Sequence, residues 1–138
     1  MNSIEKYDIK ILLTFGKAID GRKDFFKWLL ENGYPELAAL SNSIRGDEDA
    51  LQWLLKNGYP EFAILSNAMD NEPNAVQWLI NSKSELMFYF AQASRGDEDA
   101  IKWFKNKQLP VFISFAEKIN NLLKLQAKEN TFWYKIKF

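Results

Sequence analysis

Residues 28–42 read WLLENGYPELAALSN, and residues 53–67 repeat this stretch with few changes as WLLKNGYPEFAILSN. A looser third copy, WLINSKSELMFYFAQ, covers residues 78–92, and a fourth, WFKNKQLPVFISFAE, covers residues 103–117. Each copy starts with Trp and begins 25 residues after the previous one. Self-similarity at a fixed period is typical of repeat proteins. The spacing therefore predicts a chain built from copies of one unit.

The repeat also extends upstream of the first Trp. Residues 12–21, LLTFGKAIDG, align with LAALSNSIRG at 37–46, which is the second half of a unit. We predict about four and a half copies in a single domain. The predicted boundaries are a partial unit at 1–23, full units at 24–48, 49–73, 74–98 and 99–123, and a C-terminal cap and tail at 124–138.

Each unit is predicted to hold two short helices. In the second unit, apolar residues recur with a helical period over 48–57. Gly58 follows, and glycine tolerates the left-handed conformation after a helix. Pro60 opens the second helix, where its missing N–H costs nothing. One such unit cannot bury its apolar face alone, but stacked units can. The pattern predicts an all-α fold, a right-handed α-solenoid of about nine helices.

Two columns of the repeat carry predictions about packing. The four aligned Trp residues, which are Trp28, Trp53, Trp78 and Trp103, are expected in the core, since large aromatic side chains dominate protein cores. A second column is always small, which allows neighbouring helices to approach closely. Its members are Gly16, Ser41, Ser66, Ala91 and Ala116.

The string RGDEDA stands at residues 45–50 and again at 95–100. Its glycine shares a column with Gly21 and Asn71, and Gly and Asn best tolerate the position after a helix. Asp47 and Asp97 then suit the N-cap of the next helix. A calcium loop needs acidic residues at alternate positions before the glycine, and an Arg-Gly-Asp adhesion signal needs secretion. We therefore interpret the string as a helix stop followed by a helix start.

The terminal units should be atypical, because each end of a stack has one face without a neighbour. The last helix is expected to run on to about Lys128 as a cap. Phe132, Tyr134 and Ile136 then alternate with other residues at the period of a strand. We predict an extended aromatic tail over 131–138 that packs over the last repeat. The alternative is a strand that pairs with another chain.

The stretch RGDEDALQWLLKNG at 45–58 resembles the outer-helix part of an ankyrin repeat, whose pattern is roughly G-H-x-E-[IV]-V-x-L-L-L-x-x-G. Asp49 lies at the acidic position of that pattern, and Pro35 and Leu37 are similar to the T-P-L-H helix start of the family. The resemblance covers residues 12–117 as a pattern. The unit is shorter than the usual repeat of about 33 residues and lacks the segment of the β-hairpin finger. The resemblance implies ankyrin-like helix pairs and a role in protein–protein interaction.

The composition argues against several classes of function. The chain of 138 residues has no Cys and no His, which removes thiolate chemistry and the commonest general base and metal ligand. Lys plus Arg equal Asp plus Glu at 18 each, which leaves only a local basic patch to attract nucleic acid. The N-terminal residues show neither a membrane span nor a signal peptide. We expect no enzyme activity, metal, cofactor, nucleic-acid or membrane partner, and a cytoplasmic location.

A non-enzymatic protein- or peptide-binding scaffold is the expected function, and the chain is expected to be a monomer or a weak homo-oligomer. Asn42, Asn67 and Gln92 share one position of the second helix and are predicted to form a polar ladder for a peptide backbone. Tyr89 is the predicted anchor. The alternative role of the three amides is as solvated residues or local caps. The alternative function is an oligomerisation module that uses the aromatic tail. An enzyme would have to rest on residues that recur with the unit, such as Glu36, Glu61, Tyr34 and Tyr59.

Overall fold

The computed structural model describes residues 2–136, and the side chains of residues 2–130. Every regular element in this part of the chain is helical, which confirms the predicted all-α class. Within residues 2–136, one short 3-10 helix precedes nine α-helices. In chain order these are η1 (Ile4–Lys6), α1 (Ile9–Ile19), α2 (Lys23–Glu31), α3 (Pro35–Ile44), α4 (Glu48–Lys56), α5 (Pro60–Met69), α6 (Pro73–Asn81), α7 (Glu85–Ser94), α8 (Glu98–Asn106) and α9 (Pro110–Ile136).

The turns at the two RGDEDA strings confirm the predicted helix stop and start. Gly46 and Gly96 have φ angles of 99° and 92°, and Asn71 in the same column has a φ of 60°. This left-handed region favours Gly and Asn after a helix. Asp47 and Asp97 cap α4 and α8, since each carboxylate accepts a hydrogen bond of 2.9 Å from the backbone N–H two residues later. Each string therefore separates two helices.

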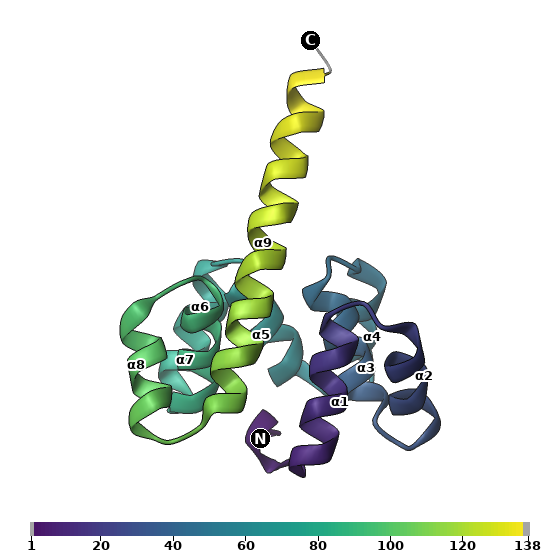
Figure 1. Cartoon of the computed structure of the whole chain (residues 1–138), viewed down its shortest axis with the longest axis vertical. Helices are drawn as coiled ribbons and strands as arrows, with labels where there is room; N and C mark the ends of the chain where they lie inside the picture. Colours follow the sequence, from purple (N-terminus) through teal and green to yellow (C-terminus); the bar gives the residue numbers. More distant parts are fainter. Residues whose placement is uncertain (1, 137–138) are drawn as a thin grey trace.

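The helices form an inner layer and an outer layer (Figure 1). The inner helices α1, α3, α5, α7 and α9 pack each on the next one. Each outer helix, α2, α4, α6 and α8, packs on the inner helix before it and the inner helix after it. The predicted column of small residues lies on the inner helices and is buried at every position, from Gly16 to Ala116. Small buried side chains let neighbouring inner helices approach closely.

The inner layer closes on itself, because α1 also contacts α9. Phe15 and Phe115 meet edge to face, with ring centroids 5.7 Å apart. Beside them, Nζ of Lys118 lies 2.9 Å from Oδ2 of Asp20. A Cβ atom at Gly16 would lie 2.6 Å from the Phe115 ring, so the side-chain-free residue permits this approach. The expectation that each end has a face without a neighbour is wrong, since the two end helices cover each other.

The core lies between the layers, and the aligned Trp residues are not part of it, contrary to the prediction. Trp28 and Trp78 are 41% and 39% exposed, and Trp53 and Trp103 are half-buried. The next residue in each outer helix takes the buried position; in α4 this is Leu54. The reason is that an outer helix packs against other helices on one side only. Its apolar arc is wider than this contact, so the residues at the margin of the arc stay partly exposed. The largest fully buried side chains are instead Phe15, Phe62, Phe90, Phe104, Phe112 and Phe115.

The C-terminal helix is longer than the sequence pattern indicated. The backbone of α9 stays helical to Ile136, so the extended tail predicted over 131–138 is wrong for residues 131–136, and residues 137–138 lie outside the described part. No Gly or Pro follows Pro110, and adding one residue to an existing helix is favourable for most other residue types. The second half of α9 extends away from the body rather than packing over the last repeat (Figure 1).

Candidate functional site

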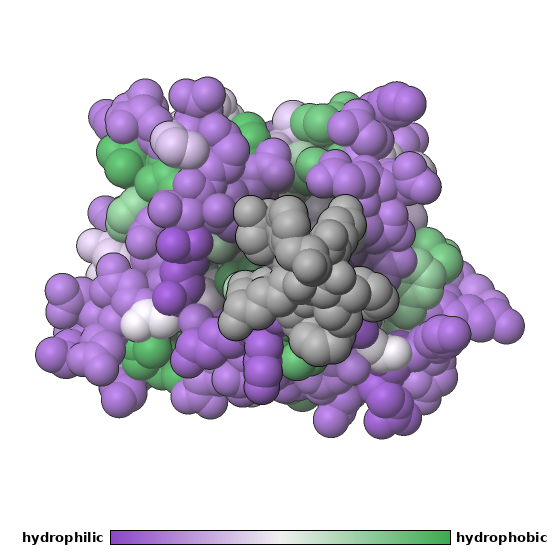
Figure 2. Space-filling model, turned by 90° about the horizontal axis from the view of Figure 1, so that it is seen from above, coloured by the Kyte–Doolittle hydropathy of each residue, from purple (hydrophilic) through white to green (hydrophobic). Residues whose placement is uncertain are grey.

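Hydrophobic side chains remain exposed on the outer helices. Leu30 of α2, Leu55 of α4 and Ile80 of α6 occupy the same position in successive units and are 47% to 49% exposed. Trp28 and Trp78 add to this apolar surface. Seen from above, hydrophobic residues gather in separate patches near the rim of a mainly hydrophilic face (Figure 2). Apolar residues that recur on the surface of successive units mark the outer side as a candidate interaction surface.

A hollow that we call the first groove lies between the outer helices α2 and α4, with the inner helix α3 as its floor. Its volume is about 340 Å³. This is large enough for one bulky side chain. The residues that matter here are Phe26 and Leu30 of α2, Ala39 and Asn42 of α3, and Asp49 and Trp53 of α4. The walls are thus apolar, with one amide, Asn42, and two carboxylates, Asp47 and Asp49, among the lining residues.

A second hollow, the basic hollow, adjoins the first groove and shares Phe26, Leu30 and Asn42 with it. Its volume is about 520 Å³. Four cationic side chains line it, which are Arg22, Lys23, Lys27 and Arg45. The two hollows therefore lie side by side across α2, α3 and the start of α4, and we call them together the depression.

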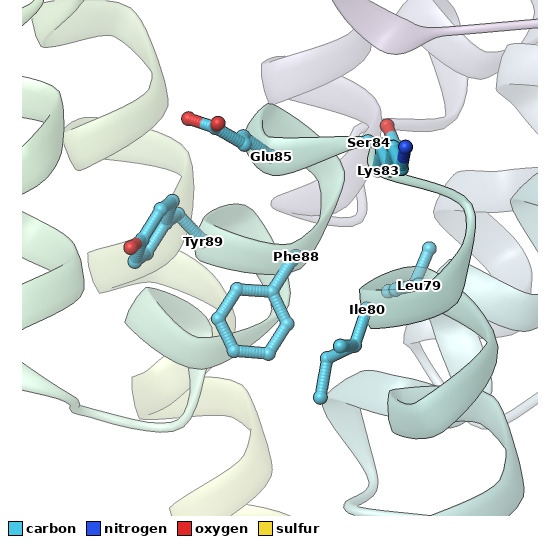
Figure 3. Close-up of a pocket in the computed structure, with 7 residues that line it drawn as sticks. All are labelled: Leu79, Ile80, Lys83, Ser84, Glu85, Phe88 and Tyr89. Carbon is cyan, nitrogen blue, oxygen red and sulfur yellow. The ribbon is translucent and has the colours of Figure 1, made fainter.

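The third unit has a different hollow, of about 430 Å³, between α6 and α7 (Figure 3). Leu79 and Ile80 come from α6, while Phe88 lies between Ile80 and Tyr89 in this view. The Tyr89 ring stacks on Trp103 of α8, with centroids 4.6 Å apart. Tyr89 is thus half-buried against an outer helix.

The predicted ladder residues lie on the inner helices α3, α5 and α7, and Asn42 lines both the first groove and the basic hollow. Asn42, Asn67 and Gln92 are all half-buried. Within the described residues, none of the three side-chain amides makes a hydrogen bond, so none of them caps a helix. Asn42 and Tyr89 line different hollows. The structure therefore does not bring the predicted anchor to the first amide, and the ladder stays a prediction.

Residues that the sequence reasoning missed are the ones that give the grooves different shapes. The floor position is Ala39 in the first unit, Ile64 in the second and Tyr89 in the third. A small floor residue leaves the first groove open, while a large one reaches across to the next outer helix. The signal that could have found these residues is the size of the aligned side chains, which differs between units at this position.

One of the repeated carboxylates, Glu36, anchors the N-terminal segment at the start of α3. The hydroxyl of Tyr7 donates a 2.8 Å hydrogen bond to Oε2 of Glu36, and Glu36 is only 7% exposed. Burial, and then the hydrogen bond to the Glu36 carboxylate, raise the pKa of the Tyr7 hydroxyl above its ordinary value. Tyr7 therefore stays a neutral donor that holds the segment after η1 against α3. This contact assigns Glu36 a structural role.

Among the residues whose side chains are described, no group of three or more acidic side chains converges as a metal site would require. In the same part of the chain, no helix is both long enough and apolar enough to cross a lipid bilayer. Comparison with family models, with curated proteins and with solved structures finds no match to this chain.

Proposed function

We propose that the chain is a non-enzymatic α-solenoid of about four and a half 25-residue repeats that binds a peptide or a partner protein between its outer helices. The observation that carries the proposal is the first groove, an apolar depression that lies beside the exposed residues of the outer helices. Concave surfaces between stacked helices are the usual binding sites of helical-repeat proteins.

Contacts that recur between neighbouring units support the repeat architecture. Arg45 donates a hydrogen bond to the carbonyl of Ile19, and Arg95 donates one to the carbonyl of Met69. Both bonds join residues 26 apart in the sequence, at the ends of successive inner helices. Such nearest-neighbour contacts are what a stack of equivalent units requires.

The free amides of Asn42, Asn67 and Gln92 support a role in holding a peptide backbone. An amide offers both a donor and an acceptor, and in this chain those groups are not occupied by side-chain hydrogen bonds within the described residues. Half-burial beside apolar residues would also strengthen a hydrogen bond to a bound chain, since water competes less there.

The test is affinity purification with the wild-type chain and with a variant that carries Asn42→Ala, Asn67→Ala and Gln92→Ala. We expect the free energy of unfolding to change by only about 0.5 kcal/mol, as for surface positions, while the copurifying partner is lost. A matched control replaces three exposed amides elsewhere, at Gln52, Asn74 and Asn121. The proposed ladder fails if the variant unfolds, or if it retains the partner as well as the control does.

The second candidate function is an oligomerisation module that uses the end of α9. It is favoured by the way α9 extends from the body (Figure 1) and by Leu125, which is 53% exposed on it. An isolated helical segment of this length is only marginally stable in water, so a contact with another molecule would stabilise it. Light scattering on the full chain and on a chain that ends at residue 128 separates the two: only this second function predicts that the number of chains per particle falls on truncation.

A further inference from the structure

We propose that the first groove and the basic hollow form one binding site for a bipolar peptide, in which a large apolar residue is flanked by an acidic residue on one side and a basic residue on the other. This inference rests on the proposed function and names the class of partner for it. The proposed occupant is a segment of a separate protein. We choose a peptide with one acidic and one basic residue because the two ends of the depression carry opposite charges.

The middle of the depression is apolar and open because of Ala39. Trp53, on the far wall, stacks on Tyr59 of its own unit, with centroids 6.1 Å apart and planes 10° from parallel. In the third unit Tyr89 stands in place of Ala39, and its ring stacks on Trp103, which corresponds to Trp53. Ala39 is too small to do this, so the space between Phe26 and Trp53 stays free for a side chain of the ligand.

One end of the depression carries uncommitted positive charge. Arg22 pairs with Asp24 at 3.0 Å, and Arg45 donates to the carbonyl of Ile19 at 2.9 Å. Lys23 forms no ion pair within the described residues. Lys27 has only a contact of 3.8 Å to Glu31, between side chains that are 75% and 62% exposed, and pairs this exposed contribute little. Lys23 and Lys27 are therefore available to an acidic residue of the ligand.

The other end is acidic. Asp47 uses one carboxylate oxygen to cap α4, where it accepts hydrogen bonds from the N–H groups of Asp49 and Ala50. The carboxylate of Asp49 forms no ion pair within the described residues, is exposed, and lies at the edge of the first groove. Complementary charge at the two ends of a groove fixes the orientation and the choice of partner.

Among the aligned units of the repeat, only the first has lysines at both positions of the basic end. A shift of 25 residues replaces Lys23 and Lys27 by Glu48 and Gln52 in the second unit, and a shift of 50 residues replaces them by Pro73 and Gln77. In the fourth unit Glu98 replaces Lys23, while a lysine, Lys102, remains at the position of Lys27. No later unit therefore carries both lysines of the basic end. Between the two ends of the site, Asn42 lines both hollows, and its free amide is placed to bind the peptide backbone.

The experiment measures binding of fluorescent synthetic peptides to the full chain by anisotropy. Each peptide has one central Phe or Leu, with Asp on one side and Lys on the other at a spacing of about one to three residues, in both chain directions. The controls keep the central residue but carry only Asp or only Lys. We expect the best bipolar peptide to bind at least about tenfold more tightly than either control, and added salt to weaken it.

Two variants test the site itself. Ala39→Tyr introduces the residue that the third unit has at this position, as in Tyr89, and should weaken binding of the bipolar peptide by about tenfold or more. Ser114→Tyr makes the same change at the exposed position of this column in the fourth unit, and should leave binding unchanged. The double variant Lys23→Glu, Lys27→Glu makes both ends acidic, so its preference should switch to the peptide that carries only Lys. A switch of preference cannot come from simple unfolding.

Three outcomes would overturn the inference. In the first, the bipolar peptide binds Ala39→Tyr as well as it binds wild type. In the second, no peptide binds, although a copurified partner is still lost from the variant with three amides replaced; the proposed function then stands and only the class of ligand is wrong. In the third, light scattering shows that the chain self-associates and that Ala39→Tyr abolishes this, which would make a second copy the occupant.

Discussion

At the scale of single residues, neighbours in the sequence have opposite roles on the outer helices. Trp53 is half-buried and lies at a groove, whereas Leu54 is fully buried. The repeat makes the Trp column the most conspicuous one in the sequence, but the Leu column beside it fills the space between the layers. Identity across copies therefore does not separate core residues from surface residues in this chain, because both recur with the unit.

This difference predicts the order of two substitutions. Leu54→Ala should lower the free energy of unfolding by about 2–5 kcal/mol, since it leaves a cavity in the core. Trp53→Ala should cost less, nearer the ~1 kcal/mol of a typical substitution, because the ring is only partly buried and lies at the margin of the core. Urea denaturation of both variants measures the two values. An equal or larger loss for Trp53→Ala would place the Trp column in the core after all.

At the scale of helices, the parts that could be predicted from the sequence depend on local chemistry. The ends of α4 and α8 follow from Gly, Asp and Pro residues within a few positions, and such effects need no knowledge of the rest of the fold. The end of α9 could not be predicted in the same way. The apolar residues at 132, 134 and 136 fit a strand period, but the same stretch lacks any Gly or Pro that would stop the preceding helix.

The contacts between successive inner helices contain one position that breaks the pattern. Arg45, Arg95 and Asn120 occupy one column, and each donates a hydrogen bond to a carbonyl at the end of the preceding inner helix. Asp70, which directly follows α5, occupies the same column. A carboxylate only accepts hydrogen bonds, so Asp70 cannot make this contact while it is ionised. Burial raises the pKa of Asp70 above its ordinary value, and Arg95 opposes this shift.

Asp70→Asn should therefore stabilise the chain at neutral pH. Asn supplies the missing donor, as Asn120 does, and one hydrogen bond contributes about 0.5–1.5 kcal/mol. The sign of the pH dependence follows from the raised pKa: the folded state favours the protonated carboxyl, so wild type loses stability as the pH rises above about 4. Urea denaturation should show a gain for Asp70→Asn at pH 7 that shrinks toward pH 3. A gain that is constant with pH would mean that ionisation of Asp70 is not the cause.

At the scale of the whole molecule, the closure of the inner layer is the feature that the sequence could not reveal. Whether the first and last helices meet depends on the rotation accumulated over all units, and no single residue pattern encodes that sum. The same holds for the candidate site, where the amides could be located on the inner helices but the shape of each groove depends on how Ala39 and Tyr89 pack in three dimensions. Only Gly16, as the one glycine in the column of small residues, has a clear relation to the closure.

The closure predicts that a substitution in the first helix affects the last one. Gly16→Ala improves intrinsic helix propensity by about 1 kcal/mol, yet its Cβ would lie 2.6 Å from the ring of Phe115. Overpacking of a core typically costs about 1–3 kcal/mol, so we expect a small or negative net change in stability together with a local loss of order. Hydrogen exchange should become faster in α1 and also in the part of α9 that contacts it, about a hundred residues away in the sequence.

A matched control separates this coupling from general destabilisation. Gly33 has a φ of 87°, and a Cβ there would meet no atom within 4 Å. Gly33→Ala should therefore strain only the turn between α2 and α3, and speed exchange there without an effect on α9. An open stack frays independently at its two ends, because each unit touches only its neighbours. If Gly16→Ala speeds exchange in α1 but leaves α9 as protected as in the Gly33→Ala variant, the contact between the first and last helices does not couple them, and the molecule behaves as an open stack in solution.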